Sequence, residues 1–319
     1  MLQQELELSL SPRNKATLQE ASEIYDCGHN KFRCGAEVPL LGDNFMDLSV
    51  RLRMDYLTRQ DFLDNKLPES LRKRLIQYAQ TLKGNNYDLT RWHVWLEIDT
   101  SAGVVDRSGL FVHIVDKTLF SLAMNFLDNQ RQEYVKSFLT MHPLFLRNIL
   151  YLGLMYSRMD MPLKVISQLI PYDFDLKIRD MEQIVGKALP ADLKDVIKRL
   201  YRANYIGCNA AIEIMPDGVL GNIAGLEIVF TEATVERLRE IIMEPAVGEL
   251  WEALLRYGVL DERYKRLSKV TLLKKTIING EKTVFLSYLS HIKLSWDKDG
   301  LLPVKAYIGA DFNHRRTEI

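Results

Sequence analysis

The sequence predicts an α+β protein in which repeated α-α-β-β units form an antiparallel sheet or barrel, with a polar lumen and with helices outside. Three observations lead to this fold class. A hairpin pattern occurs four times, helical patterns separate the hairpins, and each strand is apolar on one parity and polar on the other. The hairpins are Arg91–Asp99 with Leu110–Val115, Leu152–Tyr156 with Leu163–Leu169, Cys208–Met215 with Gly225–Phe230, and Leu286–Trp296 with Pro303–Gly309.

Residues that interrupt strands stand between the two arms of each hairpin. Glycine and proline end extended segments, and Asp and Asn hydrogen-bond their own backbone in tight turns. The turn residues are Gly103 and Gly109, Asp160 with Pro162, Pro216-Asp217-Gly218, and Asp297-Lys298-Asp299-Gly300. Each pair of apolar runs is therefore expected to fold back on itself.

Apolar residues at helical spacing fill the stretches between the hairpins. Helices are expected over residues 68–84, 119–139, 144–150, 174–185, 191–203, 232–243 and 245–257, with a shorter one from Asp261. No Gly/Ser-rich linker interrupts this order, so we expect one domain over residues 1–319. Within it, residues 1–66 are an irregular N-terminal segment, residues 67–310 hold the repeated units, and residues 311–319 are a tail.

The alternation within the strands bears most directly on function. In the first strand Val94 and Leu96 share one face, whereas Trp95 and Glu97 share the other. The last hairpin alternates in the same way, with apolar positions on one face and Lys, His, Ser and Tyr on the other. A sheet that lines a solvated cavity needs such faces, but an antiparallel sheet with one face in water shows them too. The alternation therefore fits both a sheet that lines a cavity and a sheet with one face in water.

Length, charge and cysteine content exclude several classes of protein. A chain of 319 residues that is 47% hydrophobic can bury a large core without disulfides. Lys plus Arg and Asp plus Glu both number 42, so there is no general electrostatic drive toward nucleic acid or an anionic membrane. The three cysteines follow no regular spacing, which argues against the disulfide framework of a secreted protein. The sequence shows no apolar core of a signal peptide and no apolar segment long enough to span a membrane. We expect a cytoplasmic protein.

Common catalytic signatures are missing from the sequence: GxGxxG after a strand, the Walker motif, HExxH, GxSxG and DDxxD. Cys27, His29 and Cys34 offer three metal-binding side chains within eight residues. Their spacing fits no standard zinc site, and no further Cys or His lies nearby. We therefore expect no metal centre in the protein.

Three lysines in the middle of predicted strands form the most informative group: Lys164, Lys293 and Lys305. Lysines that point into a shared space repel one another unless carboxylates or a bound anion compensate them. The candidate compensating carboxylates are Glu97, Glu213 and Glu227. Two interpretations stay open: a closed internal network of charges, or a site in which the lysines hold a phosphate or diphosphate. We predict that the three lysines share one site, with Tyr307 on the same face.

These residues and their arrangement resemble the ABBA-type aromatic prenyltransferases. The resemblance covers residues 68–310 at the level of architecture and rests on the repeated α-α-β-β units, on Lys293 in His-Ile-Lys-Leu, on Lys305-Ala-Tyr307 and on Glu97 in Trp-Leu-Glu-Ile. In that family the strands close around a solvent-filled lumen inside a ring of helices. The family barrel usually has five units and four are recognised here, so Leu6–Leu10 and Ala36–Leu40 are candidates for the missing hairpin.

The resemblance implies a transferase that moves an isoprenyl group from an allylic diphosphate to an aromatic or peptide side-chain nucleophile. It implies that Glu97 takes or orients the proton of the acceptor, and that Tyr307 and Trp95 or Trp296 shield the allyl cation. Mg²⁺ bound with the diphosphate is the candidate cofactor. The residues expected to bind substrate are Lys164, Lys293, Lys305, Tyr307, His291, Glu213, Glu227, Trp95 and Arg158.

Other functions remain open from the sequence. The polar face suits a non-catalytic module that binds a peptide or small molecule in a biosynthetic pathway. It also suits a structural or assembly protein whose acidic and basic strand residues pair internally. A different hydrolase or transferase is a further alternative, since a fold does not determine chemistry.

Overall fold

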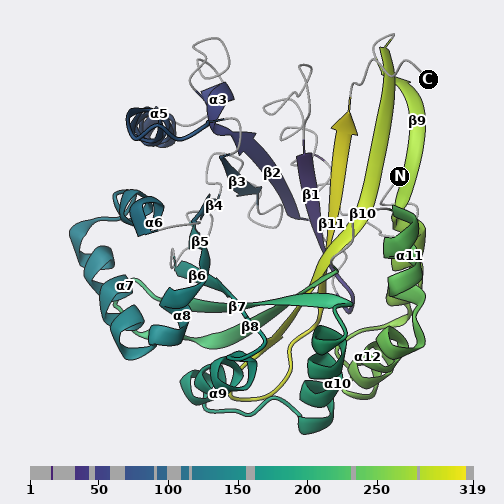
Figure 1. Cartoon of the computed structure of the whole chain (residues 1–319). Coiled ribbons are helices and arrows are strands. Elements are labelled where there is room, and N and C mark those ends of the chain that lie inside the picture. Colours follow the sequence, from purple (N-terminus) through teal and green to yellow (C-terminus); the bar gives the residue numbers. More distant parts are fainter. Residues whose placement is uncertain are drawn as a thin grey trace.

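The computed structural model describes residues 16, 33–42, 47–57, 69–89, 92–98, 109–114, 117–155, 162–230, 235–278 and 281–313. Within these ranges one antiparallel sheet of eleven strands forms the centre of the molecule (Figure 1). The strands are β1 (Arg33–Pro39), β2 (Asp47–Arg53), β3 (His93–Ile98), β4 (Gly109–His113), β5 (Ile149–Leu154), β6 (Leu163–Gln168), β7 (Ile206–Ile214), β8 (Leu220–Phe230), β9 (Leu272–Ile278), β10 (Glu281–Trp296) and β11 (Lys305–Asn313).

The sheet closes into a barrel of ten strands. Strands β1 to β8 pair in chain order, β8 pairs with β10, and β11 joins β10 to β1. At the point of closure, Tyr307 of β11 is the register partner of Glu37 on one side and of His291 on the other. Strand β9 pairs with the first part of β10 and extends the sheet beside the ring. Of the two expected forms, an antiparallel sheet or a barrel, the structure has the barrel.

Helices lie outside the barrel (Figure 1). In chain order they are α3 (Met54–Leu57), α5 (Glu69–Gly84), α6 (Lys117–Met124), α7 (Asn129–Met141), α8 (Pro143–Arg147), α9 (Phe174–Val185), α10 (Ala191–Arg202), α11 (Val235–Met243), α12 (Pro245–Arg256) and α13 (Leu267–Val270), with a 3-10 turn at Glu262–Arg266. Their apolar faces cover the outward parity of the strands, which is the one that carries Val94, Leu226 and Ile292.

Local signals account for where several helices begin and end. Pro245 opens α12, where its missing N–H is not needed and its fixed φ suits the first turn. The α9 helix ends at Gly186 in the left-handed region at φ 74°, which suits a residue without a side chain. In α10 the buried residues recur at helical spacing, so a single stripe packs on the barrel: Leu193, Val196, Ile197 and Leu200.

The fifth hairpin comes from a segment that the sequence analysis treated as irregular. Strand β1 covers most of Ala36–Leu40, as expected for one arm, but the second arm is β2. Leu6–Leu10, the other candidate arm, lies outside the described residues. Alternating Leu48, Val50 and Leu52 place β2 in the ring beside β3, so this hairpin completes the barrel.

Other boundaries differ from the expected ones. The long helix over residues 119–139 is two helices, because Asp128 starts α7 by accepting a hydrogen bond from the Arg131 backbone N–H at 2.8 Å. The helix expected over residues 144–150 ends early, and β5 already begins at Ile149. Strand β9 was not expected. Residues 311–313 belong to β11 rather than to a tail.

Packing between the barrel and its helices should dominate stability. We expect Leu226→Ala to lower the free energy of unfolding by about 2–5 kcal/mol, because it leaves a cavity at a side chain with no exposed surface. Urea denaturation followed by circular dichroism measures this change. The matched control is Val219→Ala in the β7–β8 turn, where the side chain is 59% exposed and little change is expected. Equal losses in both variants would contradict this packing.

Candidate active site

Register partners across the antiparallel pairs trace one continuous inward face around the barrel. Residues directly opposite each other on paired strands point to the same side of the sheet. Starting from β6, the partners are Lys164 with Glu213, Asn209 with Glu227, Glu227 with Lys293, Lys293 with Lys305, Tyr307 with Glu37, Gly35 with Ser49, Ser49 with Glu97, Trp95 with Phe111, and Phe111 with Gly153, which returns to Lys164.

Three predicted lysines therefore lie on the inward face: Lys164, Lys293 and Lys305. The neighbouring positions on this face hold the other predicted residues that the structure describes: Glu97, Trp95, Glu213, Glu227, His291 and Tyr307. Arg158 lies outside the described residues. Trp296 lies on the opposite parity, is buried against the outer layer, and donates its indole N–H to the Lys187 carbonyl at 3.1 Å. The expectation that Trp296 shields a cation in the lumen was wrong.

Two of the lysines have carboxylate partners on the same face. Lys305 donates to Glu37 in a short hydrogen-bonded ion pair. Lys164 lies 3.8 Å from Glu213, and its ammonium also stands over the Phe111 ring at 5.6 Å from the centroid. Asn209 donates to Glu227 at 3.1 Å. Part of the polar face is thus an internal network of charges, as one of the two interpretations required.

Glu37 is the member of this network that the sequence analysis missed. Burial alone would raise the pKa of its carboxyl, but the charges of Lys305 and Lys293 and hydrogen bonds from Lys305 and Tyr307 lower it from 4.5 to about 2. This carboxylate holds both Lys305 and Tyr307 in place. The alternation of Gly35 and Glu37 against Ala36 and Val38 was the available signal, in a segment judged irregular.

Lys293 has no hydrogen bond or ion pair with any residue that the structure describes. Burial and the neighbouring Lys164 ammonium lower its pKa from 10.5 to about 8. Carboxylates on the inward face oppose this shift: those of Glu37, Glu213 and Glu227. The side chain runs over Gly225, where a Cβ would lie only 2.8 Å from the Lys293 Cε, so glycine there provides its path.

Tyr307 and His291 form a stacked pair next to these charges. Their ring centroids lie 4.1 Å apart with the planes 14° from parallel. Burial and the Glu37 and Glu97 carboxylates raise the pKa of the Tyr307 phenol well above 10, so it remains a hydrogen-bond donor. Burial lowers the pKa of His291, which favours a neutral ring. The pair presents a flat, uncharged surface beside the lysines.

Glu97 is the second charged group of this face without a direct partner among the described residues. It is nevertheless close enough to raise the pKa values of Lys305 and Tyr307. Gly109 stands opposite it on β4, so no side chain covers it from that strand. A carboxylate in this position can accept a proton or a hydrogen bond from a ligand in the lumen.

The sequence analysis also missed a cluster of aromatic rings along β3 to β5. His113 lies between His93 and Tyr151, with both centroid distances 5.0 Å, and Trp92 stands 5.9 Å from it. Burial and the nearby Arg51 lower the pKa of His113, which favours the neutral ring. Arg51 approaches the His93 Nδ1 at 3.0 Å. The rings of His93, His113 and Tyr151 continue the surface of Trp95 and Phe111 along the inward face.

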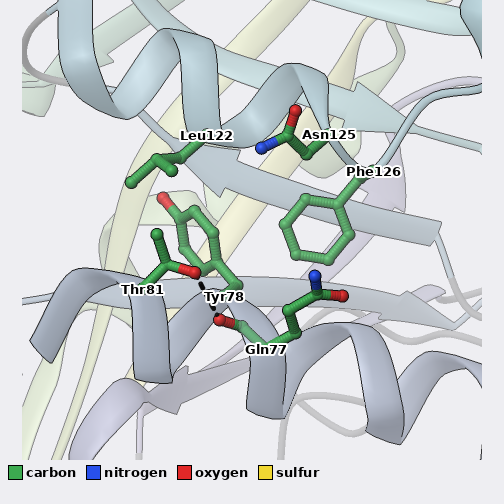
Figure 2. Close-up of a pocket in the computed structure, with 6 residues that line it drawn as sticks. All are labelled: Gln77, Tyr78, Thr81, Leu122, Asn125 and Phe126. Atoms are coloured by element: carbon green, nitrogen blue, oxygen red, sulfur yellow. Dashed lines mark hydrogen bonds between the residues drawn. The ribbon is translucent and has the colours of Figure 1, made fainter. Parts of the chain in front are cut away.

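Other parts of the described chain offer less to a charged ligand. A pocket outside the barrel between α5 and α6 is lined by Gln77, Tyr78, Thr81, Leu122, Asn125 and Phe126 (Figure 2). It holds no charged side chain, and an edge-to-face contact of Tyr78 with Phe126 at 5.2 Å borders it. Among the described residues no cluster of three or more His, Cys, Asp or Glu side chains could hold a metal ion. No described helix has the length and apolarity needed to span a membrane.

Comparison with known proteins found similarity to solved structures. No family model matches the chain, and no curated protein matches it by sequence. Among solved structures, the chain is similar to AnaPT from Neosartorya fischeri. The TM-score is 0.47 and the identity 11%, over 91% of this chain and 79% of that one.

The Glu37 carboxylate should make the protein sensitive to acid. Its pKa is about 2 in the folded protein against an ordinary 4.5, so its contribution is complete above pH 4.5 and is lost as the pH falls toward 2. We expect Glu37→Gln to lower the free energy of unfolding at neutral pH by on the order of 2–3 kcal/mol and to flatten its decline in acid.

Denaturant titrations over a range of pH measure this effect. The control is Glu133→Gln, which removes a surface carboxylate that is 70% exposed and pairs with Lys136. It should change stability by less than about 1 kcal/mol. If the free energy of unfolding of Glu37→Gln falls in acid as steeply as that of the wild type, Glu37 carries no such ion pair.

Proposed function

We propose that this barrel transfers an isoprenyl group from an allylic diphosphate to an aromatic or peptide side-chain nucleophile. The observation that carries the proposal is a pair of charged side chains without direct partners among the residues that the structure describes: the Lys293 ammonium and the Glu97 carboxylate. A network that served only to neutralise itself would have no need of either group. One unpaired cation and one unpaired anion on a shared inward face suit a reaction that releases an anion and a proton.

The cationic half of the site would bind the leaving group. Lys293 lies between Glu227 and Lys305 in the register, and Lys164 is near enough to lower its pKa. A diphosphate placed there would accept hydrogen bonds from Lys293 and would relieve the repulsion among the three ammonium groups. Mg²⁺ would arrive on the diphosphate oxygens, since no cluster of protein ligands for a metal is present among the described residues.

The chemical step follows from these charges. The bond between the allylic carbon and the diphosphate oxygen breaks, the electron pair leaves with the diphosphate, and the lysines stabilise that anion. The stacked Tyr307 and His291 rings and the Trp95 ring would face the allyl cation and stabilise it through their π electrons. The acceptor attacks the same carbon, and Glu97 takes its proton.

Calorimetric titration with a non-hydrolysable dimethylallyl or geranyl diphosphate analogue tests the proposal. We expect wild-type protein to bind, and Lys293→Ala to bind about 10–100-fold more weakly, because a charge-assisted hydrogen bond is lost. The matched control is Lys298→Ala in the exposed turn of the same hairpin, which should bind like wild type.

Glu97→Gln separates binding from transfer. It should keep the affinity for the diphosphate analogue and should lose transfer to tyrosine-, tryptophan- or histidine-containing peptides by about 100-fold or more. Binding of peptides without any binding of diphosphate, with or without Mg²⁺, would contradict the transferase and favour a peptide-binding module.

A further inference from the structure

Lys293 has a second chemical property that diphosphate binding does not use. Its amine is the only one of the three lumen lysines without a direct carboxylate partner among the described residues. Both neighbours in the register are engaged elsewhere, since Glu227 accepts from Asn209 and Lys305 donates to Glu37. The lone pair of a deprotonated Lys293 would therefore face the lumen rather than a protein group.

The surroundings favour the deprotonated amine and leave it reachable. Burial and a second ammonium nearby are the two conditions that activate a lysine as a nucleophile. Lys293 meets both, with Lys164 as the neighbouring cation, and its pKa of about 8 leaves part of the population neutral near physiological pH. The side chain is half-buried rather than sealed, and Gly225 leaves it room along the strand.

We propose that Lys293 is a site of covalent imine formation with small anionic carbonyl compounds, of the class of phosphorylated aldehydes and α-keto acids. The neutral amine adds to the carbonyl carbon, the carbonyl oxygen takes up a proton, and the carbinolamine then loses water to leave a C=N bond. Glu227, the carboxylate opposite Lys293 in the register, would carry the protons between amine and oxygen.

An anionic group on the carbonyl compound is required by the charges that remain. When Lys293 reacts, Lys164 and Lys305 keep their ammonium groups on the same face. A phosphate or carboxylate on the ligand would interact with them, whereas a neutral aldehyde would not. Selectivity over exposed lysines thus comes from two sources, the neutral amine and the neighbouring cations.

Reductive trapping tests this directly. The protein is incubated with pyridoxal phosphate at about pH 8, reduced with borohydride, and mapped by peptide mass spectrometry. We expect Lys293 to be labelled at least about tenfold faster than the exposed Lys136, because burial and Lys164 lower the pKa of Lys293 and because Lys164 and Lys305 lie on the same face. Pyridoxal without the phosphate should label Lys293 more slowly.

Lys293→Arg keeps the positive charge and should lose the adduct, and Lys298→Arg should keep it. Labelling spread evenly over surface lysines, or unchanged total labelling in Lys293→Arg, would overturn the proposal. The result is independent of the transferase: an adduct at Lys293 in a protein that binds no diphosphate analogue would support imine formation alone. Protection of Lys293 by the analogue would show that both ligands occupy the same site.

Discussion

Closure of the sheet is the constraint on which the rest of this structure depends. Strand β11 pairs with β1 and β10 at once, so the inward side chains of ten strands share one enclosed space instead of one wet face. In an open sheet the same charges would be solvated individually and would carry no chemical meaning. In the closed ring they act on one another, which is visible in the pKa of Glu37, lowered to about 2, and that of Lys293, lowered to about 8.

The two interpretations of the polar face, an internal network and a ligand site, are both partly right. Lys305 with Glu37 and Lys164 with Glu213 are internal pairs that fix the positions of their neighbours. Lys293 and Glu97 are the two charged groups of this face that have no direct partner among the described residues. The paired groups hold Tyr307 and the remaining charges in place without reorganising when a ligand arrives, and such preorganisation favours both anion binding and proton transfer. Because Lys293 has no direct partner among the described residues, it is also a candidate nucleophile.

Sequence patterns predicted the parts of the fold that repeat regularly. Alternation in 93–98, 206–214 and 291–296 placed Glu97, Glu213 and Lys293 on one parity, and the barrel brings that parity together. The sequence analysis did not identify β2 and β9 as strands, although Leu48, Val50 and Leu52 alternate in β2 and each of the two strands pairs with one adjacent in sequence, β2 with β1 and β9 with β10. Glu37 was missed because its role depends on Lys305, which is 268 residues away. The sequence analysis misplaced Trp296 because it lies close to Lys293 in the sequence, although its side chain has the opposite parity on the strand.

The ionisation of Lys293 is the most direct test of the account, because it depends on burial, on the nearby Lys164 and on the lack of a direct partner within the described part of the chain. Lysine labelled with ¹³C at the ε-carbon allows its pKa to be measured by NMR, with Lys293→Arg used to assign the signal. We predict a midpoint near 8 in the free protein and an upward shift when a diphosphate analogue binds, since an anion favours the charged amine. A midpoint near 10.5 that the analogue does not move would contradict the account.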